Sequence, residues 1–87
     1  MITREILVSN ETGLTARAAA TFVQHTNRFS SDIYLHLPGG TVDAKSIMGI
    51  ISMGIRKGAL ITLTCEGIDE NKAMDNLEQL LTQGSSR

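Results

Sequence analysis

Alternation of apolar and polar residues predicts most of the strands in this chain. Residues 2–8, apart from Arg4, and the runs 32–37 and 60–66 place apolar side chains at every second position, as half-buried strands do. A turn of one proline and two glycines, followed by a short strand at 41–43, completes a hairpin with the second run. The sequence therefore predicts four strands.

Apolar residues at helical spacing predict three helices between these strands. The first begins at an N-cap on Thr15 and runs toward Arg28, the second is short and begins at an N-cap on Ser46, and the third begins at a cap on Asp69, where Ile68 is expected to staple onto the first turns. The residues expected to face the core are Ala16, Ala19, Ala20, Phe22 and Val23 in the first helix, Ile47, Ile50, Ile51, Gly54 and Ile55 in the second, and Ala73, Leu77, Leu80 and Leu81 in the third.

The short helix has a second face that invites two interpretations. Met48, Ser52 and Met53 are left to point away from the core, beside an exposed hydroxyl that Ser46 is expected to present at the positive end of the helix. A flexible, polarizable methionine beside such a serine would suit a docking surface, whereas methionine at helical spacing is more often core filler. Spacing alone favours core filler.

The element order predicts the fold class. Strand, helix, strand, strand, short helix, strand and helix suit an α+β domain, with a four-stranded, mainly antiparallel sheet, three helices on one face and water on the other. A chain of 87 residues with 41% hydrophobic content is large enough for one core and too small for two. We therefore expect a single domain over 1–87, with a loose tail at 84–87.

Charge and cysteine content exclude several classes of protein. The formal net charge of −1 comes from 8 basic and 9 acidic residues without a large block of either sign, so neither nucleic acid nor a membrane surface is an expected partner. No apolar run approaches a membrane span, and the start of the chain lacks the pattern of a signal peptide, so we expect a cytoplasmic protein. Cys65 is the only cysteine, and its expected role is that of a small buried apolar residue.

Few residues could support catalysis or hold a cofactor. His25 and His36 are the only histidines and have no ligand spacing with carboxylates or cysteine, so neither a metal site nor any cofactor is expected. The glycine spacings match no nucleotide-binding motif, and no serine has a histidine base beside it in sequence, so we do not expect an enzyme. Arg17 lies in the first turn of its helix, where the helix dipole opposes a cation; it is either a solvated surface residue or an arginine held ready for an anion.

Four motifs resemble one known family in order and spacing. They are Gly13-Leu14-Thr15-Ala16-Arg17-Ala18-Ala19, Lys45-Ser46-Ile47-Met48-Gly49, Gly54-Ile55-Arg56-Lys57-Gly58 and Gly67-Ile68-Asp69-Glu70-Asn71. The chain resembles HPr, the histidine-containing phosphocarrier of the bacterial sugar phosphotransferase system, over essentially its whole length. This resemblance implies an open-faced β-sandwich with three helices, in agreement with the order of elements predicted above.

The chain departs from the family pattern at the phosphate-carrying residue. Where the family has histidine before Ala-Arg-Pro, this chain has Thr15, and it has Ala18 in place of the proline. A threonine phosphoester is too stable to replace phosphoimidazole in a relay, so phosphotransfer is expected to be lost while Thr15 still caps the helix. With Ser46 retained, the chain resembles the Crh branch of the family, found in bacilli and their relatives, although glutamine and not threonine is associated with that branch at this position.

The resemblance implies a regulatory function. HPr kinase/phosphorylase would phosphorylate Ser46, and the modified protein would bind the LacI-type repressor CcpA as a corepressor in carbon catabolite repression. The residues implied in partner binding are Thr15, Arg17, Ala20, Ile47, Met48 and Ile51. Alternatives are a phosphorylation-gated binder of a metabolic enzyme, or an atypical phosphocarrier using His25 or His36. A monomer and a strand-exchanged homodimer both stay open.

Overall fold

The structure is a computed structural model that describes residues 1–83. Its elements, in chain order, are β1 (Ile2–Leu7), α1 (Ala16–Thr26), β2 (Asp32–Leu37), β3 (Gly40–Asp43), α2 (Ile47–Met53), β4 (Leu60–Glu66) and α3 (Glu70–Thr82). This is the predicted order of strands and helices, with boundaries that differ by a few residues at most. The tail expected at 84–87 lies outside the described residues.

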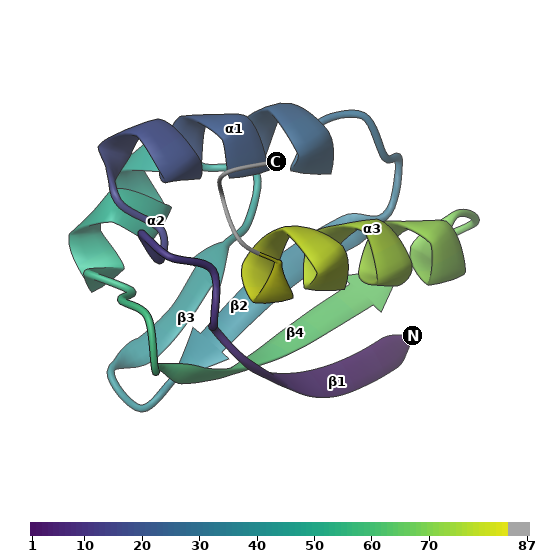
Figure 1. Cartoon of the computed structure of the whole chain (residues 1–87). Coiled ribbons are helices and arrows are strands. Elements are labelled where there is room, and N and C mark those ends of the chain that lie inside the picture. Colours follow the sequence, from purple (N-terminus) through teal and green to yellow (C-terminus); the bar gives the residue numbers. More distant parts are fainter. Residues whose placement is uncertain (84–87) are drawn as a thin grey trace.

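The four strands form one antiparallel sheet in the order β1-β4-β2-β3. In the register, Leu63 of β4 lies between Arg4 of β1 and Leu35 of β2, so β4 and β2 are the central strands. Figure 1 shows α1 and α3 lying over the same face of this sheet, with α2 beside α1. The predicted α+β fold, an open-faced sandwich, is confirmed.

The core lies between the sheet and the helices. Its residues come from every element except β3, and the fully buried larger side chains include Val8, Phe22, Ile33, Leu35, Ile50, Ile55, Ile61, Leu63, Met74, Leu77 and Leu81. Cys65 is buried among them, as predicted, and burial raises the pKa of its thiol to about 11. A thiol with such a pKa stays protonated near neutral pH and is a poor nucleophile.

The core-facing stripes differ from the predicted ones at several helix positions. Ile51 was expected in the core but is 41% exposed, whereas Met53, expected to point away, is partly buried against the core. Successive helical residues are turned by about 100°, so Met53 stands about 60° from the buried Ile50 and Ile51 about 100° from it. The core meets α2 along the Ile50–Met53 side, and the same geometry accounts for the burial of Met74 beside Leu77.

Two further predictions about helix starts are wrong. Ala16 was expected in the core but is exposed, because Leu14, just before the helix, is buried there instead. Ile68 does not staple onto α3, since its side chain is 98% exposed. The chain enters α3 after Gly67, whose φ of +155° and close approach to Ser31 direct Ile68 outward; a Cβ on Gly67 would lie 2.7 Å from the Ser31 Cα atom.

Asp69 stands at the N-cap position of α3 but makes no side-chain cap, contrary to prediction. Its carboxylate instead accepts hydrogen bonds from the backbone N–H groups of Ser30, at 2.9 Å, and Ser31, at 3.0 Å, and from the Ser31 hydroxyl. The neighbouring Glu70 accepts from the Gly67 N–H group at 3.0 Å. The Asp69 carboxylate therefore joins the α1–β2 loop to the β4–α3 turn.

We expect the Asp69 carboxylate to make the free energy of unfolding depend on pH under acidic conditions. The hydrogen bonds from Ser31 and Ser30 lower the pKa of Asp69 to about 2 from a usual 3.8. A group with a depressed folded-state pKa contributes stability that is complete above its unfolded pKa and is lost as pH falls through its folded pKa. Urea unfolding of the wild type between pH 5 and about pH 2 should show this loss, and Asp69→Asn should flatten that part of the profile. The matched control is Asp32→Asn, which removes an exposed carboxylate; equal flattening by both variants would contradict the assignment.

Candidate functional site

Ser46 occupies the N-cap position of α2, as predicted. Its backbone is extended, with φ −106° and ψ 109°, and its Oγ accepts a hydrogen bond from the Gly49 N–H group at 3.2 Å. The Ser46 N–H group in turn donates to the carbonyl of Asp43 at the end of β3, at 3.0 Å. The side chain is half-buried and not fully exposed as expected, because it folds back over the first turn of its own helix.

Gly49 leaves space beside this hydroxyl. A Cβ at this position would lie 3.4 Å from the Ser46 Oγ atom and 3.5 Å from the Cβ atom of Val42, which is ordinary van der Waals contact. With hydrogen alone at Gly49, no side chain from this residue contacts the Ser46 oxygen. A substituent on this oxygen therefore meets no side chain from Gly49.

The segment before Ser46 is fixed by contacts with three other elements. Ala44 is buried; its N–H group donates to the carbonyl of Ile33 in β2 at 2.9 Å, and its own carbonyl accepts from the Thr26 hydroxyl at the end of α1 at 2.9 Å. The ammonium group of Lys45 donates to the carbonyl of Phe29 at 2.9 Å. Ser46 is thus held at a defined position relative to α1 and the sheet.

The apolar residues predicted beside Ser46 differ in exposure. Met48 is 73% exposed and Ile51 is 41% exposed, while Ile47 is half-buried and packs against the core. We call Met48 and Ile51 the α2 patch. Because Met48 faces solvent, it is not core filler, and its role in docking stays a prediction.

The other predicted partner-binding residues lie in the first half of α1. Thr15 occupies the N-cap position, and its carbonyl accepts from the Ala19 N–H group at 2.6 Å, but its side chain makes no cap hydrogen bond. The prediction that Thr15 caps α1 through its hydroxyl is therefore wrong, because the side chain does not turn toward the N–H groups of the first turn. Arg17 is exposed and Ala20 is half-buried.

The structure places Thr15 beside the end of α2 and Ser46 beside the end of α1, while Ala20 and Ile51 lie along the two helices between them. The Leu14 N–H group, just before α1, donates to the carbonyl of Ile55, just after α2, at 2.9 Å, while the Thr26 hydroxyl at the end of α1 contacts Ala44, before α2. The helices therefore run antiparallel, with Ser46 near the C-terminal end of α1. No hydrogen bond or ion pair within residues 1–83 joins Arg17 to Ser46.

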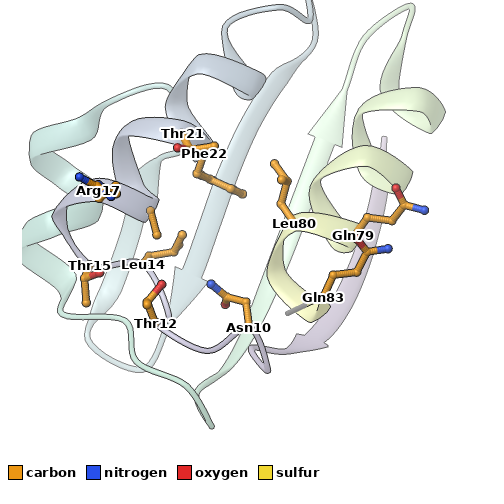
Figure 2. Close-up of a pocket in the computed structure, with 11 residues that line it drawn as sticks. Asn10, Thr12, Leu14, Thr15, Arg17, Thr21, Phe22, Gln79, Leu80 and Gln83 are labelled. Atoms are coloured by element: carbon orange, nitrogen blue, oxygen red, sulfur yellow. The ribbon is translucent and has the colours of Figure 1, made fainter. Parts of the chain in front are cut away.

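An open pocket of about 520 Å³ lies between the loop before α1, α1 itself and α3. Figure 2 shows Arg17 on one side of it, Gln79 of α3 and Gln83 just after α3 on the other, and Asn10 between Thr12 and Gln83. Sequence reasoning missed the pocket residues Asn10, Gln79 and Gln83. No local signal could have found them, because the two segments are almost 70 positions apart in the chain and meet only through packing.

The two histidines, His25 and His36, make polar contacts with residues other than Ser46 and the pocket residues. His25 Nδ1 lies 3.0 Å from the Asn76 Oδ1 atom, and His36, in β2, lies between the hydroxyls of Thr41, at 2.9 Å, and Thr64, at 2.8 Å. Within the described part of the chain, no three His, Cys, Asp or Glu side chains gather as metal ligands would. The same residues include no helix of sufficient length and hydropathy to cross a bilayer.

Comparison with known proteins decides the family. The family model for the PTS HPr component phosphorylation site matches residues 2–83. The chain belongs to the HPr family. It is 49% identical over 77 residues to the HPr-like protein Crh of Halalkalibacterium halodurans, covering 88% of this chain and 92% of that protein. The predicted membership of the HPr family, with similarity to Crh, is thereby confirmed.

Two solved structures of HPr-family proteins resemble this one. The crystal structure of the phosphocarrier protein HPr from Bacillus anthracis has a TM-score of 0.89 at 46% identity and covers 92% of this chain and 95% of its own. The crystal structure of Bacillus subtilis Crh, a domain-swapped dimer, has a TM-score of 0.73 at 43% identity and covers 93% of each chain. The HPr fold is thus retained in a chain with threonine at position 15.

The N-cap geometry predicts how substitutions at Ser46 affect stability. Ser46→Ala removes the acceptor for the Gly49 N–H group and should lower the free energy of unfolding by about 1 kcal/mol. Ser46→Asp keeps an acceptor at the helix start and should remain within about 0.5 kcal/mol of the wild type. Urea unfolding at neutral pH measures both, and an alanine variant as stable as the wild type would contradict the capping role.

Gly49→Ala tests the space beside the hydroxyl. Alanine gains helix propensity over glycine and meets only ordinary contacts here, so the variant should be more stable by up to about 1 kcal/mol. Thermal or urea unfolding would measure this gain. A loss of stability would mean that the turn around Ser46 tolerates no added methyl group.

Proposed function

We propose that this protein is a regulatory member of the HPr family that acts by binding and not by catalysis. HPr kinase/phosphorylase phosphorylates Ser46, and the phosphorylated protein binds CcpA as a corepressor in carbon catabolite repression. The observation that carries this proposal is the position of Ser46 at the start of α2, directly beside the exposed Met48. Its similarity to Crh, together with threonine at position 15, supports regulation over phosphate relay.

The surroundings of Ser46 suit a phosphate group. A phosphoserine adds about −1.5 to −2 charges and three acceptor oxygens. No acidic residue lies in the first turn of α2, and Gly49 places no side chain beside the oxygen. The N–H group of Gly49, which now donates to the Ser46 Oγ atom, faces the place where the phosphate would stand. The modification therefore needs no rearrangement of the helix.

The new charge requires cations from the partner. Lys45 is the basic residue next to Ser46 in sequence, but its ammonium group is bonded to the carbonyl of Phe29. Arg17 lies toward the opposite end of the α1–α2 pair. Arginine or lysine side chains of CcpA would then bind the phosphate, while the α2 patch and half-buried Ile47 supply apolar contact and Arg17, with Thr15 and Ala20, forms the second contact region.

Titration of CcpA tests the switch. The Ser46-phosphorylated protein should bind at least about tenfold more tightly than the unmodified protein, because charge-assisted hydrogen bonds to phosphate are strong. Ser46→Ala, treated with kinase and ATP, should bind no better than the unmodified protein. Isothermal titration calorimetry would measure all three, with phosphorylation mapped by mass spectrometry. Equal affinity of the three forms would remove the proposed function.

A patch variant separates docking from modification. Met48→Ser removes most of the exposed apolar surface at this helix start and should weaken binding of the phosphorylated protein to CcpA about tenfold without preventing phosphorylation. Ile68→Ser, which replaces an exposed apolar residue in the β4–α3 turn, is the matched control. If both variants bind alike, the α2 patch is not part of the contact.

A strand-exchanged homodimer is a second proposal, favoured by the domain-swapped dimer of Bacillus subtilis Crh. β1 is an edge strand that pairs only with β4 and lies against α3, so β1 of one copy can occupy the same place in a second copy. The segment after it, from Val8 to Gly13, would serve as the hinge. Arg4 would keep its ion pairs with Asp75 and Glu78, now between chains.

The ion pairs of Arg4 predict a kinetic effect. Because the same pairs form in the monomer and in the exchanged dimer, Arg4→Ala should accelerate interconversion while leaving the monomer–dimer ratio nearly unchanged. Size-exclusion chromatography with light scattering, repeated over time after dilution, would measure both quantities. Lys72→Ala, which removes an exposed cation of α3, is the control. A single monomeric species at all concentrations would exclude the dimer.

A further inference from the structure

The helices leave one face of the sheet uncovered. Figure 1 shows α1 and α3 over one face only, and no helix within residues 1–83 covers the other. Alternation along the strands turns the buried Ile6, Leu35 and Leu63 toward the helices and the residues next to them in sequence toward solvent. We call these outward-facing strand residues the open face. Its acidic members are Glu5, Asp32, Asp43 and Glu66, all exposed.

The open face is negative, although the chain as a whole is nearly neutral. Arg4 is the only lysine or arginine in the four strands, and it faces α3, where it pairs with Asp75 and Glu78. Within the described part of the chain, none of the four carboxylates of the open face forms an ion pair. This face therefore attracts cations that the chain itself does not supply.

Two of the four carboxylates stand directly opposite each other. The register pairs Asp32, at the start of β2, with Glu66, at the end of β4. Like charges that face each other across neighbouring strands repel and lower the stability of the sheet. A cation from outside the chain would relieve this repulsion. The pair therefore indicates a cationic partner, independently of the overall charge of the face.

Tyr34 identifies which cation fits best. It follows Asp32 by two positions on the same face, a separation of about 6.8 Å, and its side chain is 40% exposed. Its neighbours across the sheet are Thr64 in β4 and Asp43 in β3. A guanidinium group stacks on an aromatic ring and bonds carboxylates through two N–H groups at once, whereas an ammonium group does neither as well. An exposed tyrosine beside carboxylates thus favours arginine over lysine.

We propose that the open face binds an arginine-containing segment of a partner protein. One guanidinium group lies over Tyr34 and bonds to the carboxylates of Asp32 and Glu66. Leu7 and Leu60, which stand opposite each other at the other end of the face and are 56% and 55% exposed, contact an apolar residue of the same segment. This inference goes beyond the proposed function, because the open face contains neither Ser46 nor the α2 patch.

The spacing on β4 sets the length of a probe. Leu60 lies four residues before Thr64, which is about 14 Å along a strand, and five extended residues span up to about 17 Å. A blocked peptide Arg-Arg-Ser-Ser-Leu therefore reaches from Tyr34 to Leu60. Lys-Lys-Ser-Ser-Leu has the same charge without the planar group, and Glu-Glu-Ser-Ser-Leu has the opposite charge.

The test titrates the unmodified full chain with these peptides at low ionic strength and follows amide chemical shifts. The arginine peptide should shift the signals of Asp32, Tyr34, Thr64 and Glu66 with a dissociation constant on the order of 1 mM, as expected for a short flexible ligand. The lysine peptide should bind about threefold more weakly, and the glutamate peptide should not bind.

Variants of the face locate the binding. Tyr34→Leu should weaken the arginine peptide about threefold, to the affinity of the lysine peptide. Glu66→Gln should weaken both peptides about threefold and raise the midpoint of urea unfolding, because it removes one of two opposed charges. Weaker binding by a more stable variant cannot come from misfolding. Glu11→Gln, which removes an exposed carboxylate from the loop before α1, is the matched control and should bind as the wild type does.

Four results would overturn the proposal. No saturable shift on the open face would exclude the site, and equal affinity for the arginine and lysine peptides would mean a simple electrostatic attraction. Equal weakening by Glu11→Gln and Glu66→Gln would place the binding elsewhere. Shifts of the same signals on dilution without peptide would show that a second copy of the chain covers the face. Because the unmodified protein is used without CcpA, none of these results bears on the role of Ser46.

Discussion

The close contact between the loop before α1 and the end of α2 fixes how these two helices lie against each other. Gly13 has φ +63°, and a Cβ there would lie 2.7 Å from the Cα atom of Arg56. Only glycine fits, because the backbone is left-handed and the neighbouring chain is within contact distance. The next residue donates from its N–H group to the carbonyl of Ile55, so the start of α1 is fastened to the end of α2.

A second contact closes the other end of the pair. The Thr26 hydroxyl is fully buried and donates to the carbonyl of Ala44, two residues before Ser46. With both ends held, α2 cannot slide along α1, although it has only seven residues and is too short to be stable alone. The Ser46 hydroxyl and the α2 patch therefore present one rigid surface, which a partner can bind without first ordering it.

The antiparallel arrangement of α1 and α2 separates the Ser46 region from the region of Thr15 and Arg17, although the resemblance to HPr implies that both bind partners. Ser46 and Met48 stand at the start of α2, whereas Thr15 and Arg17 stand at the opposite end, beside the pocket that α3 closes. The family's phosphate-carrying position thus borders an open pocket in this chain, with threonine in place of the relay histidine. Each region has its own chemistry: a helix-capping hydroxyl beside exposed apolar side chains, and a cation beside neutral hydrogen-bonding groups.

Strand positions could be predicted from the sequence more accurately than the buried face of α2. Strands 32–37 and 60–66 were predicted to the residue, because alternation has a period of two and an error of one position would reverse the buried face. The face of α2 was predicted less well, because helical spacing admits a wide apolar stripe and only the neighbours decide which part of it is covered. Ile51 and Met53 exchanged places for that reason.

Order along the chain was sufficient to indicate the α+β class and the capping serine at position 46, and the resemblance to HPr indicated that position 15 lacks the family's histidine. These features depend on residue type and on near neighbours in sequence. Packing alone determined that Met48 faces water and that Asn10 and Gln79 line the same pocket. It also determined that the Asp69 carboxylate accepts hydrogen bonds from Ser30 and Ser31 and does not cap its own helix. Such features arise where segments distant in sequence meet, and no local pattern encodes which segments these are.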